Sequence, residues 1–331
     1  MARSVLHRIL TCEAGEGDHA ERGGGGGNAL DPGVFCHMTL SAASIDAFIA
    51  RAGSVTSVII AELTAVRGSS PREAGAFMLV SDAAQDGTIG GGALEYMVID
   101  RARQVLREGG HEDDLDIPLG PEIGQCCGGR VDVALRRLSA ATVDRLKARI
   151  AAELEARPHV FLFGSGHVGH ALARALAVLP LQVHVVDTRP DELTELPANV
   201  TIHAVPMPEA VVRSAPSGSA YVILTHDHAL DFLIGAEALQ RADAPYVGMV
   251  GSKTKRAKFR SWYLEEGYPA TALDRLVLPI GGKAFPGGLG DKRPEVIAAL
   301  AAAEILVHVG RREVTAKTRP VTTKSGAVVA D

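Results

Sequence analysis

The sequence predicts an α/β protein that consists of a C-terminal parallel-sheet domain, a smaller N-terminal α/β domain and a disordered N-terminal tail. Its 331 residues are enough for two domains of ordinary size. Beyond Pro158, short apolar runs rich in β-branched residues alternate with helical segments, which is the pattern of βαβ units in a parallel sheet. The start of the chain, by contrast, is polar and rich in glycine.

We expect a disordered tail over residues 1–37, because this segment is acidic and contains a run of five glycines. Met38 begins a more regular pattern, in which Ser41 or Ser44 is suited to cap a helix that runs through Ala52. Our hypothesis is that Met38 is the natural initiator.

The N-terminal α/β domain is predicted over residues 38–139. Its strands are expected at 54–66, 76–81 and 131–138, its helix at 93–108, and an acidic loop after that helix. A charged amphipathic helix then fills the segment 140–157, which suits a connector between domains.

The C-terminal domain is predicted over residues 158–310. Its strands are expected in the runs HVFLF, LQVHVVD, TIHAV, YVILT, YVGMV and RLVLPI, and its helices at 168–178, 229–241, 253–266 and 294–308. The last helix opens at Pro294, a residue that suits a first helical turn. Residues 311–331 are polar and are expected to form a flexible tail.

Charge and cysteine content argue against several classes of protein. The 34 basic and 39 acidic residues give a net charge of -5, which is unlike a protein that grips nucleic acid or an acidic membrane surface. Four cysteines in a chain this long do not make a disulfide scaffold, and no apolar run is long enough to span a bilayer. We therefore expect a cytoplasmic protein with reduced thiols.

The strongest local signal is the run FLFGSGHVG, which ends a predicted strand and opens an alanine-rich helix. In this G-x-G-x-x-G pattern, Gly164 permits a tight turn, Gly166 lets a phosphate approach the backbone, and Gly169 lets helix and strand pack closely. The helix N-terminus supplies N–H donors for an anion. Asp187 ends the next strand, where an acid is able to accept from a ribose hydroxyl. These features predict a Rossmann-type domain.

A second group of candidates, Thr225 to His228 followed by Asp231, lies just past the strand YVILT. Open α/β sheets place their ligand crevice at this end of the strands, so His226 and its neighbours are candidates for a ligand-facing role. Two histidines at this spacing are able to ligate a metal or to hold an anion. The alternative is that these residues cap the following helix and hydrogen-bond the loop.

The adjacent cysteines Cys126 and Cys127 are flanked by Gly124, Gly128 and Gly129, and this flexible backbone lets a large ligand approach. A cysteine there is suited to ligate a soft metal or to carry sulfur as a persulfide. The alternative is that both cysteines fill space before a strand, since free cysteine is commonly buried.

Two weaker signals remain. The glycine loop Gly90 to Gly92, followed by Glu95, opens a helix and is either an anion cradle or an ordinary tight turn. The run 253–260 has five basic residues in eight, which usually form a solvated helix face and otherwise contact a phosphate or a partner.

Taken together, the segments GSSPREAGAFMLV, GTIGGGALE, GQCCGGRV, FLFGSGHVG, VVDTRP, THDHALD, YVGMVGSKTKR and KRPEVIAALAAAE resemble, in order and spacing, the xanthine dehydrogenase accessory protein family, XdhC. The resemblance covers residues 40–310. It implies a chaperone that carries the molybdenum cofactor (molybdopterin) as cargo and protects its dithiolene. It also implies sulfuration of that cofactor by a cysteine desulfurase, delivery to apo xanthine dehydrogenase in purine catabolism, and a homodimer.

The same resemblance suggests which residues contact the cofactor. Those that would hold its phosphate are Gly164, Gly166 and Gly169, with Asp187 beside them. Those that would line the crevice are Thr225, His226 and Asp231, and those that would close it from the N-terminal domain are Gly91, Gly92 and Glu95. Those that would approach the molybdenum are Cys126, Cys127 and Gly128, with Cys127 the candidate metal ligand.

Two other functions stay open at this point. An NAD(P)-dependent oxidoreductase is favoured by the glycine motif with Asp187, although no convincing catalytic pair is evident beyond His226 and Asp231. A regulatory or scaffolding protein with an empty Rossmann-type domain would tolerate substitution at Gly166. The accessory protein, which is not itself an enzyme, is the prediction that accounts for all of the segments.

Overall fold

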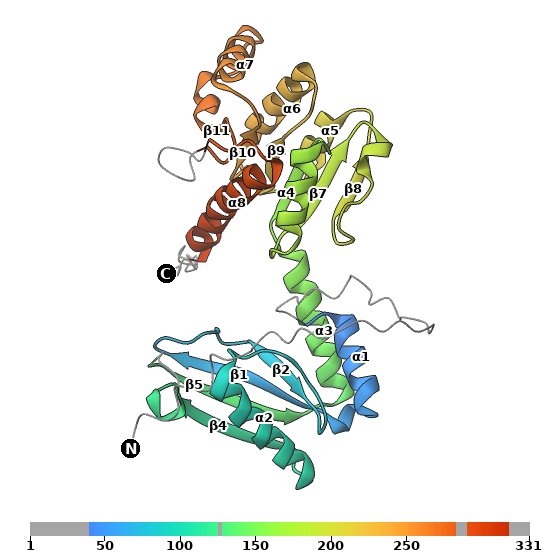
Figure 1. Cartoon of the computed structure of the whole chain (residues 1–331), viewed down its shortest axis with the longest axis vertical. Coiled ribbons are helices and arrows are strands. Elements are labelled where there is room, and N and C mark those ends of the chain that lie inside the picture. Colours follow the sequence, from blue (N-terminus) through green and yellow to red (C-terminus); the bar gives the residue numbers. More distant parts are fainter. Residues whose placement is uncertain (1–39, 125–127, 283–289, 318–331) are drawn as a thin grey trace, which may run out of the picture. The chain divides into compact units, whose positions relative to one another are not determined.

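The computed structural model describes residues 40–124, 128–282 and 290–317, which form two β-sheets (Figure 1). The N-terminal domain has an antiparallel sheet and the C-terminal domain a parallel one, in agreement with the predicted α/β class. The tail predicted at residues 1–37 lies outside the described residues, as do Cys126 and Cys127.

The N-terminal sheet has five strands in the order β3-β2-β1-β5-β4, and every neighbouring pair is antiparallel. The strands are β1 (Ile59–Arg67), β2 (Phe77–Val80), β3 (Gln85–Gly87), β4 (Glu112–Pro118) and β5 (Arg130–Arg137). The helices are α1 (Ala42–Ala52), α2 (Gly92–Arg107) and α3 (Ala140–Glu155), with 3-10 turns at Val55–Ser57 and Pro121–Ile123.

Alternation of side chains along β1 builds two apolar layers, one on each face of the sheet. Ile59, Ala61 and Leu63 pack against α2, whereas Ile60 belongs to the layer formed with α1 and α3. The α3 residues in that second layer are Val143, Leu146 and Ile150. The helix expected only as a connector is therefore part of the hydrophobic core of the N-terminal domain.

The cap predicted for the first helix is present at α1. The Ser41 hydroxyl accepts a hydrogen bond from the Ser44 backbone N–H at 3.0 Å, and the Ser44 hydroxyl accepts from the Ser41 N–H at 2.7 Å. This reciprocal pair satisfies two of the N–H groups that a helix start leaves without partners.

The acidic segment expected to be a loop is instead the edge strand β4, so that prediction was wrong. Arginines on α2 and β5 neutralise its carboxylates: Arg101 pairs with Asp113, and Arg130 pairs with Asp116 at 2.5 Å. The hydrogen bond from Arg130 holds the pKa of Asp116 below its usual value. Charged side chains on an exposed edge strand also discourage pairing with another strand, and this explains why β4 carries so few apolar residues.

The C-terminal sheet has six parallel strands in the order β11-β10-β9-β6-β7-β8. The strands are β6 (His159–Phe163), β7 (Gln182–Asp187), β8 (Thr201–Ala204), β9 (Ala220–Ile223), β10 (Val247–Met249) and β11 (Leu276–Val277). Numbered within the domain and read from β8, this is the order 3-2-1-4-5-6 of a doubly wound Rossmann sheet. The predicted Rossmann-type domain is therefore confirmed.

Helices cover both faces of this sheet (Figure 1). One layer contains α4 (His167–Ala177) and α8 (Pro294–Lys317), and the other contains α5 (Pro208–Ser214), α6 (His228–Gln240) and α7 (Lys253–Glu265). Short 3-10 turns lie at Pro190–Leu193 and Ala270–Arg275. Helix α8 begins at Pro294 as predicted but runs on to Lys317, so the first part of the segment expected to be a flexible tail is helical.

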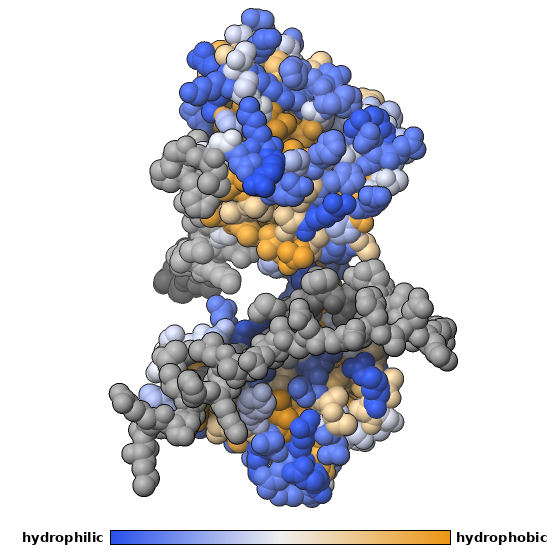
Figure 2. Space-filling view, viewed as in Figure 1, coloured by the Kyte–Doolittle hydropathy of each residue, from blue (hydrophilic) through white to orange (hydrophobic). Residues whose placement is uncertain are grey.

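Within the described residues, no helix is both long and apolar enough to cross a membrane. Figure 2 shows hydrophilic residues over most of the visible surface of the C-terminal domain, with apolar residues between them in smaller patches.

Candidate functional site

The order of the parallel strands brings together the loops that follow β6 and β9, at the carboxyl ends of the two strands. These two strands are neighbours, and the chain leaves them towards opposite sides of the sheet, which is where doubly wound folds bind ligands. The loop after β6 carries the glycine motif and the loop after β9 begins at Leu224. Both predicted groups of C-terminal candidates therefore lie at one edge of the sheet.

Each glycine of the motif occupies a place that explains its identity. Gly164 has φ +111°, and a Cβ there would lie 2.6 Å from the Leu224 carbonyl oxygen. A Cβ at Gly169 would lie 2.1 Å from the Gly164 carbonyl oxygen, so only glycine allows α4 to pack this closely. At Gly166, the N-cap of α4, a Cβ would meet open space. This position is accessible to a ligand, and the free N–H groups of the helix start lie beside it.

Asp187 is buried at the end of β7 and is fully engaged by the protein itself. Its carboxylate accepts from the Ser165 N–H and hydroxyl, both at 2.8 Å, and from the backbone and guanidinium of Arg189 at 3.0–3.1 Å. Burial acts to raise its pKa, but the hydrogen bonds from Arg189 and Ser165 outweigh burial and lower the pKa to about 2. Asp187 thus holds the glycine loop in place, and its oxygens already have the donors that a ribose would supply.

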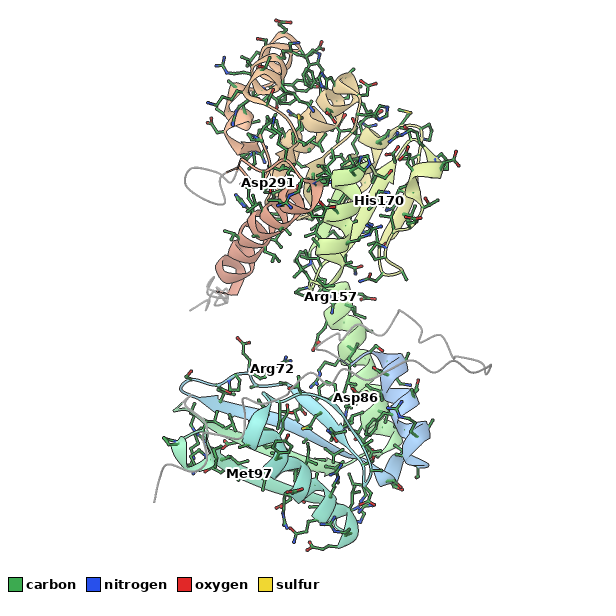
Figure 3. The ribbon with its side chains drawn as sticks, in the orientation of Figure 1. Arg72, Asp86, Met97, Arg157, His170 and Asp291 are labelled. Atoms are coloured by element: carbon green, nitrogen blue, oxygen red, sulfur yellow. The ribbon has the colours of Figure 1, made fainter. Side chains whose placement is uncertain are left out.

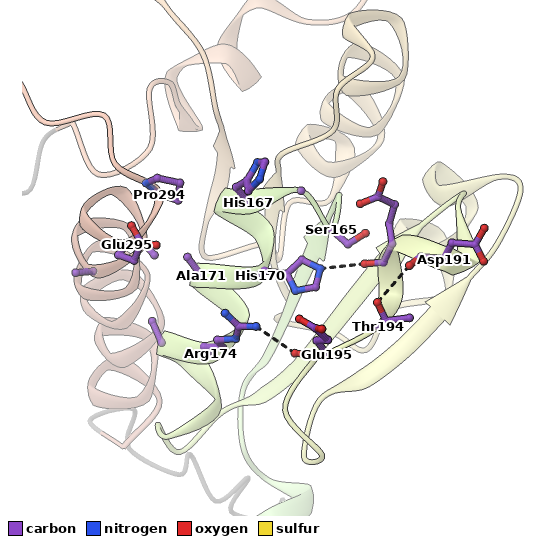
Figure 4. Close-up of a pocket in the computed structure, with 15 residues that line it drawn as sticks. Ser165, His167, His170, Ala171, Arg174, Asp191, Thr194, Glu195, Pro294 and Glu295 are labelled. Atoms are coloured by element: carbon purple, nitrogen blue, oxygen red, sulfur yellow. Dashed lines mark hydrogen bonds between the residues drawn. The ribbon is translucent and has the colours of Figure 1, made fainter.

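A groove runs from the glycine loop along the exposed face of α4 (Figure 4). We call it the α4 groove; its volume is about 680 Å³, within the range of small-molecule sites. Helix α8 borders it on one side and the 190–195 segment on the other. The residues that line it are Ser165, Gly166, His167, His170, Ala171, Arg174, Ala175, Asp191, Glu192, Thr194, Glu195, Pro294, Glu295, Ala298 and Ala299.

Asp231, which was predicted to line the crevice, is fully buried in the first turn of α6. It accepts hydrogen bonds from the Thr225 N–H at 3.1 Å and the Thr225 hydroxyl at 2.7 Å, and it forms an ion pair with Lys255 of α7. Lys255 is also buried and donates to the Val250 carbonyl oxygen at 2.9 Å. This pair ties together the loops that follow β9 and β10, so Asp231 positions Thr225.

The two histidines after β9 are exposed, as is Asp227 between them. Asp227 is the N-cap of α6 and accepts from the Ala229 N–H at 2.8 Å, which is the capping role considered as the alternative. His226 and His228 keep accessible side chains beside this cap. Among the described residues, no cluster of three potential ligands has the geometry of a metal site.

In the N-terminal domain, Glu95 occupies the glycine loop for which an anion cradle and an ordinary tight turn were the alternatives. Its carboxylate accepts from the backbone N–H groups of Ile89, Gly90 and Gly91 at 3.0, 3.3 and 2.9 Å, and from the Thr88 hydroxyl at 2.5 Å. Of the two alternatives left open by the sequence, the N–H groups of this loop do bind an anion, but it is a carboxylate of the same chain. Gly91 is the N-cap of α2 and Gly92 its first residue.

The loop that carries the cysteines is closed at its base by described residues. Gly128 donates to the Leu119 carbonyl oxygen and Leu119 donates to that of Gly129, both at 2.8 Å. A Cβ at Gly129 would lie 2.1 Å from the Ser69 carbonyl oxygen, so this base packs directly on the loop between β1 and β2. The same loop carries Arg72, labelled in Figure 3.

Pro71 of that loop packs in turn on Gly90, where a Cβ would approach the proline ring to 2.6 Å. The loop between β1 and β2 therefore contacts both of the other glycine-containing loops of the N-terminal domain, one at Ser69 and one at Pro71. The predicted residues in them are Gly91, Gly92, Glu95 and Gly128, while Cys126 and Cys127 lie outside the described residues.

Two residues of the C-terminal site were not among the predicted candidates. Arg189 follows Asp187 by two positions, and only the fold shows that its guanidinium returns to that carboxylate. Lys255 lies in the basic run, but its side chain points inwards while Lys253, Lys258 and Arg260 are exposed. A lysine at helical spacing from the buried Phe259 was the signal that could have marked it as inward-facing.

The chain matches two protein-family models, one in each of the two domains described above. The model of the XdhC Rossmann domain matches residues 160–305, and that of the XdhC and CoxI family matches residues 53–115. The uncharacterized protein YqeB of Escherichia coli (strain K12) is 27% identical over 257 residues, which cover 75% of this chain and 42% of that protein. This chain therefore spans about two fifths of the length of that relative.

A solved structure shares the architecture. The crystal structure of a xanthine dehydrogenase from Bacillus halodurans superposes with a TM-score of 0.65 at 19% identity, covering 86% of this chain and 98% of that one. At this identity the likeness concerns the fold. The two family matches follow each other along the chain, one in each domain, and the chain belongs to the XdhC family.

Proposed function

We propose that this protein is an accessory protein of xanthine dehydrogenase maturation that binds the molybdenum cofactor and delivers it to apo xanthine dehydrogenase. The observation that carries the proposal is that both domains match models of the XdhC family, whose members are associated with this maturation. In this account the molybdenum cofactor is cargo, and the protein holds it without turning over a metabolite.

The phosphate of the cofactor would bind at the glycine loop of the C-terminal domain. Gly166 is open, and the start of α4 offers N–H donors and the positive end of the helix dipole. Gly164 and Gly169 allow this turn, and Asp187 holds it through Ser165. Thr225, positioned by Asp231, and the exposed His226 would contribute the neighbouring wall of the crevice.

The N-terminal domain would contribute the molybdenum end of the site. Gly91, Gly92 and Gly128 belong to its converging loops, Glu95 organises one of them, and Cys126 and Cys127 lie between the ends of another. A thiolate is a suitable ligand for a soft metal and a suitable carrier of sulfur. Cys127→Ala should therefore reduce the molybdenum retained by the protein and leave its unfolding transition unchanged.

The partners follow from this chemistry. A cysteine desulfurase would supply the sulfur that converts the bound cofactor to its sulfurated form, and apo xanthine dehydrogenase would receive it. We place these encounters in the cytoplasm, where thiols stay reduced, and we propose a homodimer as the working assembly.

An NAD(P)-dependent oxidoreductase is the second candidate, because the glycine motif and Asp187 match the dinucleotide pattern. The hydrogen bonds at Asp187 argue against a dinucleotide-binding role. Both carboxylate oxygens already accept from Ser165 or Arg189, so binding a ribose there would require at least one of these contacts to break.

Delivery of the cofactor tests the proposal. The full chain, purified anaerobically from cells that make molybdenum cofactor, is mixed with apo xanthine dehydrogenase, and xanthine oxidation is followed over time. We expect activity to appear with the wild-type protein and to be lost with Gly166→Asp, which places a carboxylate at the phosphate site without a steric conflict. The control is Glu209→Gln on the first turn of α5. An apo enzyme that stays inactive with the wild-type protein contradicts the proposal.

A further inference from the structure

The α4 groove exists because one crossover connection of the C-terminal sheet lacks a helix. Parallel strands are usually joined through a helix, but β7 and β8 are joined by the 3-10 turn Pro190–Leu193 and extended chain. The outer face of α4 is consequently uncovered between this segment and α8, and the groove occupies that space (Figure 4).

One end of the groove is suited to a phosphate. Gly166 and His167 line it there, at the start of α4, where N–H groups of the first helical turn have no partner within the helix. The groove and the proposed phosphate site are therefore continuous.

The middle of the groove is suited to a flat ring. Ala171 and Ala175 form its floor on α4, and Ala298 and Ala299 form the side on α8, so short apolar side chains leave room for a planar heterocycle. A ring that slides between these helices would bury apolar surface on both faces.

The opposite side of the groove offers hydrogen-bond acceptors. His170 contacts the Glu192 carbonyl oxygen at 2.9 Å and Arg174 donates to that of Glu195 at 3.4 Å, so side chains of α4 hold the 190–195 segment by its backbone. Among the described residues, the carboxylates of Asp191 and Glu195 have no hydrogen bond or ion pair and remain available to a ligand.

We propose that the α4 groove binds the ring of a phosphate-bearing ligand through a 2-amino-4-oxopyrimidine edge, with the phosphate at Gly166. This edge presents an amino group and a ring N–H side by side, a pair of donors that a carboxylate accepts with two parallel hydrogen bonds. The inference rests on the proposed function, because the pterin of molybdopterin carries this edge. Guanine carries the same edge, whereas adenine and cytosine do not.

The test measures binding of four ligands to the full chain: molybdopterin, through pterin retained after gel filtration, and GMP, AMP and CMP by calorimetry. We expect GMP to bind at least tenfold more tightly than AMP or CMP. Ala299→Trp, which fills the groove from an exposed position, should weaken molybdopterin and GMP at least tenfold. Ala303→Trp, at an exposed alanine one turn further along α8 and outside the groove, should have no effect.

A second pair of variants tests whether the Glu195 carboxylate accepts the hydrogen bonds of the ring edge. Glu195→Gln should weaken GMP several-fold and leave AMP unchanged, while the exposed Glu209→Gln on α5 should change neither. Equal affinity for GMP and AMP, or full binding by Ala299→Trp, overturns the assignment of the ring to this groove.

The outcomes separate the two proposals. Molybdopterin retained by Ala299→Trp but lost from Gly166→Asp contradicts the groove and leaves the cofactor function standing. GMP binding that is sensitive to Ala299→Trp, without any molybdopterin binding, supports the ring chemistry of the groove and contradicts the cofactor function.

Discussion

The buried ion pair between Asp231 and Lys255 allows a quantitative prediction about the C-terminal domain. Asp231 has no exposed surface and Lys255 is 8% exposed, so neither charge is solvated by water when its partner is removed. Asp231→Ala would leave the ammonium group with the Val250 carbonyl oxygen, would remove the acceptor of the Thr225 N–H, and would leave the Thr225 hydroxyl only the Asp227 carbonyl oxygen. Breaking one partner of such a pair costs about 3–5 kcal/mol of unfolding free energy.

Urea denaturation followed by tryptophan fluorescence measures this cost. The chain has one tryptophan, Trp262, on the same helix as Lys255 and in ring contact with Phe232 and Phe259, so its emission reports this domain. With a slope of about 2 kcal/mol per molar, a loss of 3–5 kcal/mol lowers the midpoint by about 2 M.

A double-mutant cycle identifies the origin of the loss. The cycle compares Asp231→Leu, Lys255→Met and the double variant, which removes both charges, and we expect the double variant to recover at least half of the loss seen for Asp231→Leu alone. Lys147→Met, which removes a partner of the more exposed Asp46, should cost about 0–1 kcal/mol. A loss below about 1 kcal/mol for Asp231→Ala, or strictly additive effects, refutes the reasoning.

Three further predictions concern other parts of the molecule. Gly169→Ala should lower the free energy of unfolding by about 3 kcal/mol or more, because its Cβ would meet a carbonyl oxygen at 2.1 Å. Gly166→Ala should lower it by less than about 1 kcal/mol, because a Cβ there meets open space. Similar urea midpoints for the two variants would contradict the roles given to these glycines. Glu95→Ala should lower the free energy of unfolding by about 2–3 kcal/mol, because several loop N–H groups lose their acceptor, and calorimetry of the full chain would show this as a lower melting temperature; an unchanged transition would contradict it. His184 has its pKa lowered from 6.5 to about 4 by burial and by His159 and His203, so the unfolded chain takes up its proton first as the pH falls. The contribution of neutral His184 to the free energy of unfolding is complete above about pH 6.5 and is lost between pH 6.5 and pH 4, by about 2 kcal/mol once solvent screening is allowed for. His184→Phe should therefore flatten the fall in stability between pH 7 and 5. An equally steep fall in the variant would contradict this prediction.

Much of the C-terminal domain could be predicted from the sequence because local patterns there agree with the final structure. Apolar runs mark all six strands, and the glycine motif marks the first turn together with its acidic partner at Asp187. Two elements gave weaker signals. Helix α5 has only seven residues, and the continuation of α8 to Lys317 is polar, so neither shows the periodicity of a longer amphipathic helix.

The N-terminal domain was harder to predict because long-range pairing decides its structure. The stretch Glu112–Pro118 has few apolar residues. It forms a strand because its backbone pairs with β5 and because arginines of β5 form ion pairs with its carboxylates. Strand β3 has only three residues, too few for a sequence pattern, and it forms a strand because it pairs with β2.

The candidate site shows the same limit. The sequence marked Asp187, Asp231 and Glu95 as candidate ligand contacts. Whether each carboxylate faces a ligand or its own chain depends, however, on hydrogen-bond partners that the sequence pattern does not reveal. Ser165 is the partner in the first case and Lys255 in the second, at separations of 22 and 24 residues. Glu95 is nearer its partners, yet only the curled backbone of Thr88 to Gly91 brings their donors together.

The most direct test of the central claim is the cofactor content of the protein itself. Protein purified anaerobically from a host that makes molybdenum cofactor is analysed for molybdenum and for oxidised pterin fluorescence per chain, and binding of added NAD(H) is measured on the same sample. We predict near-stoichiometric pterin and no NAD(H) binding. NAD(H) binding without pterin, even after incubation with free cofactor, would contradict the account and favour an oxidoreductase.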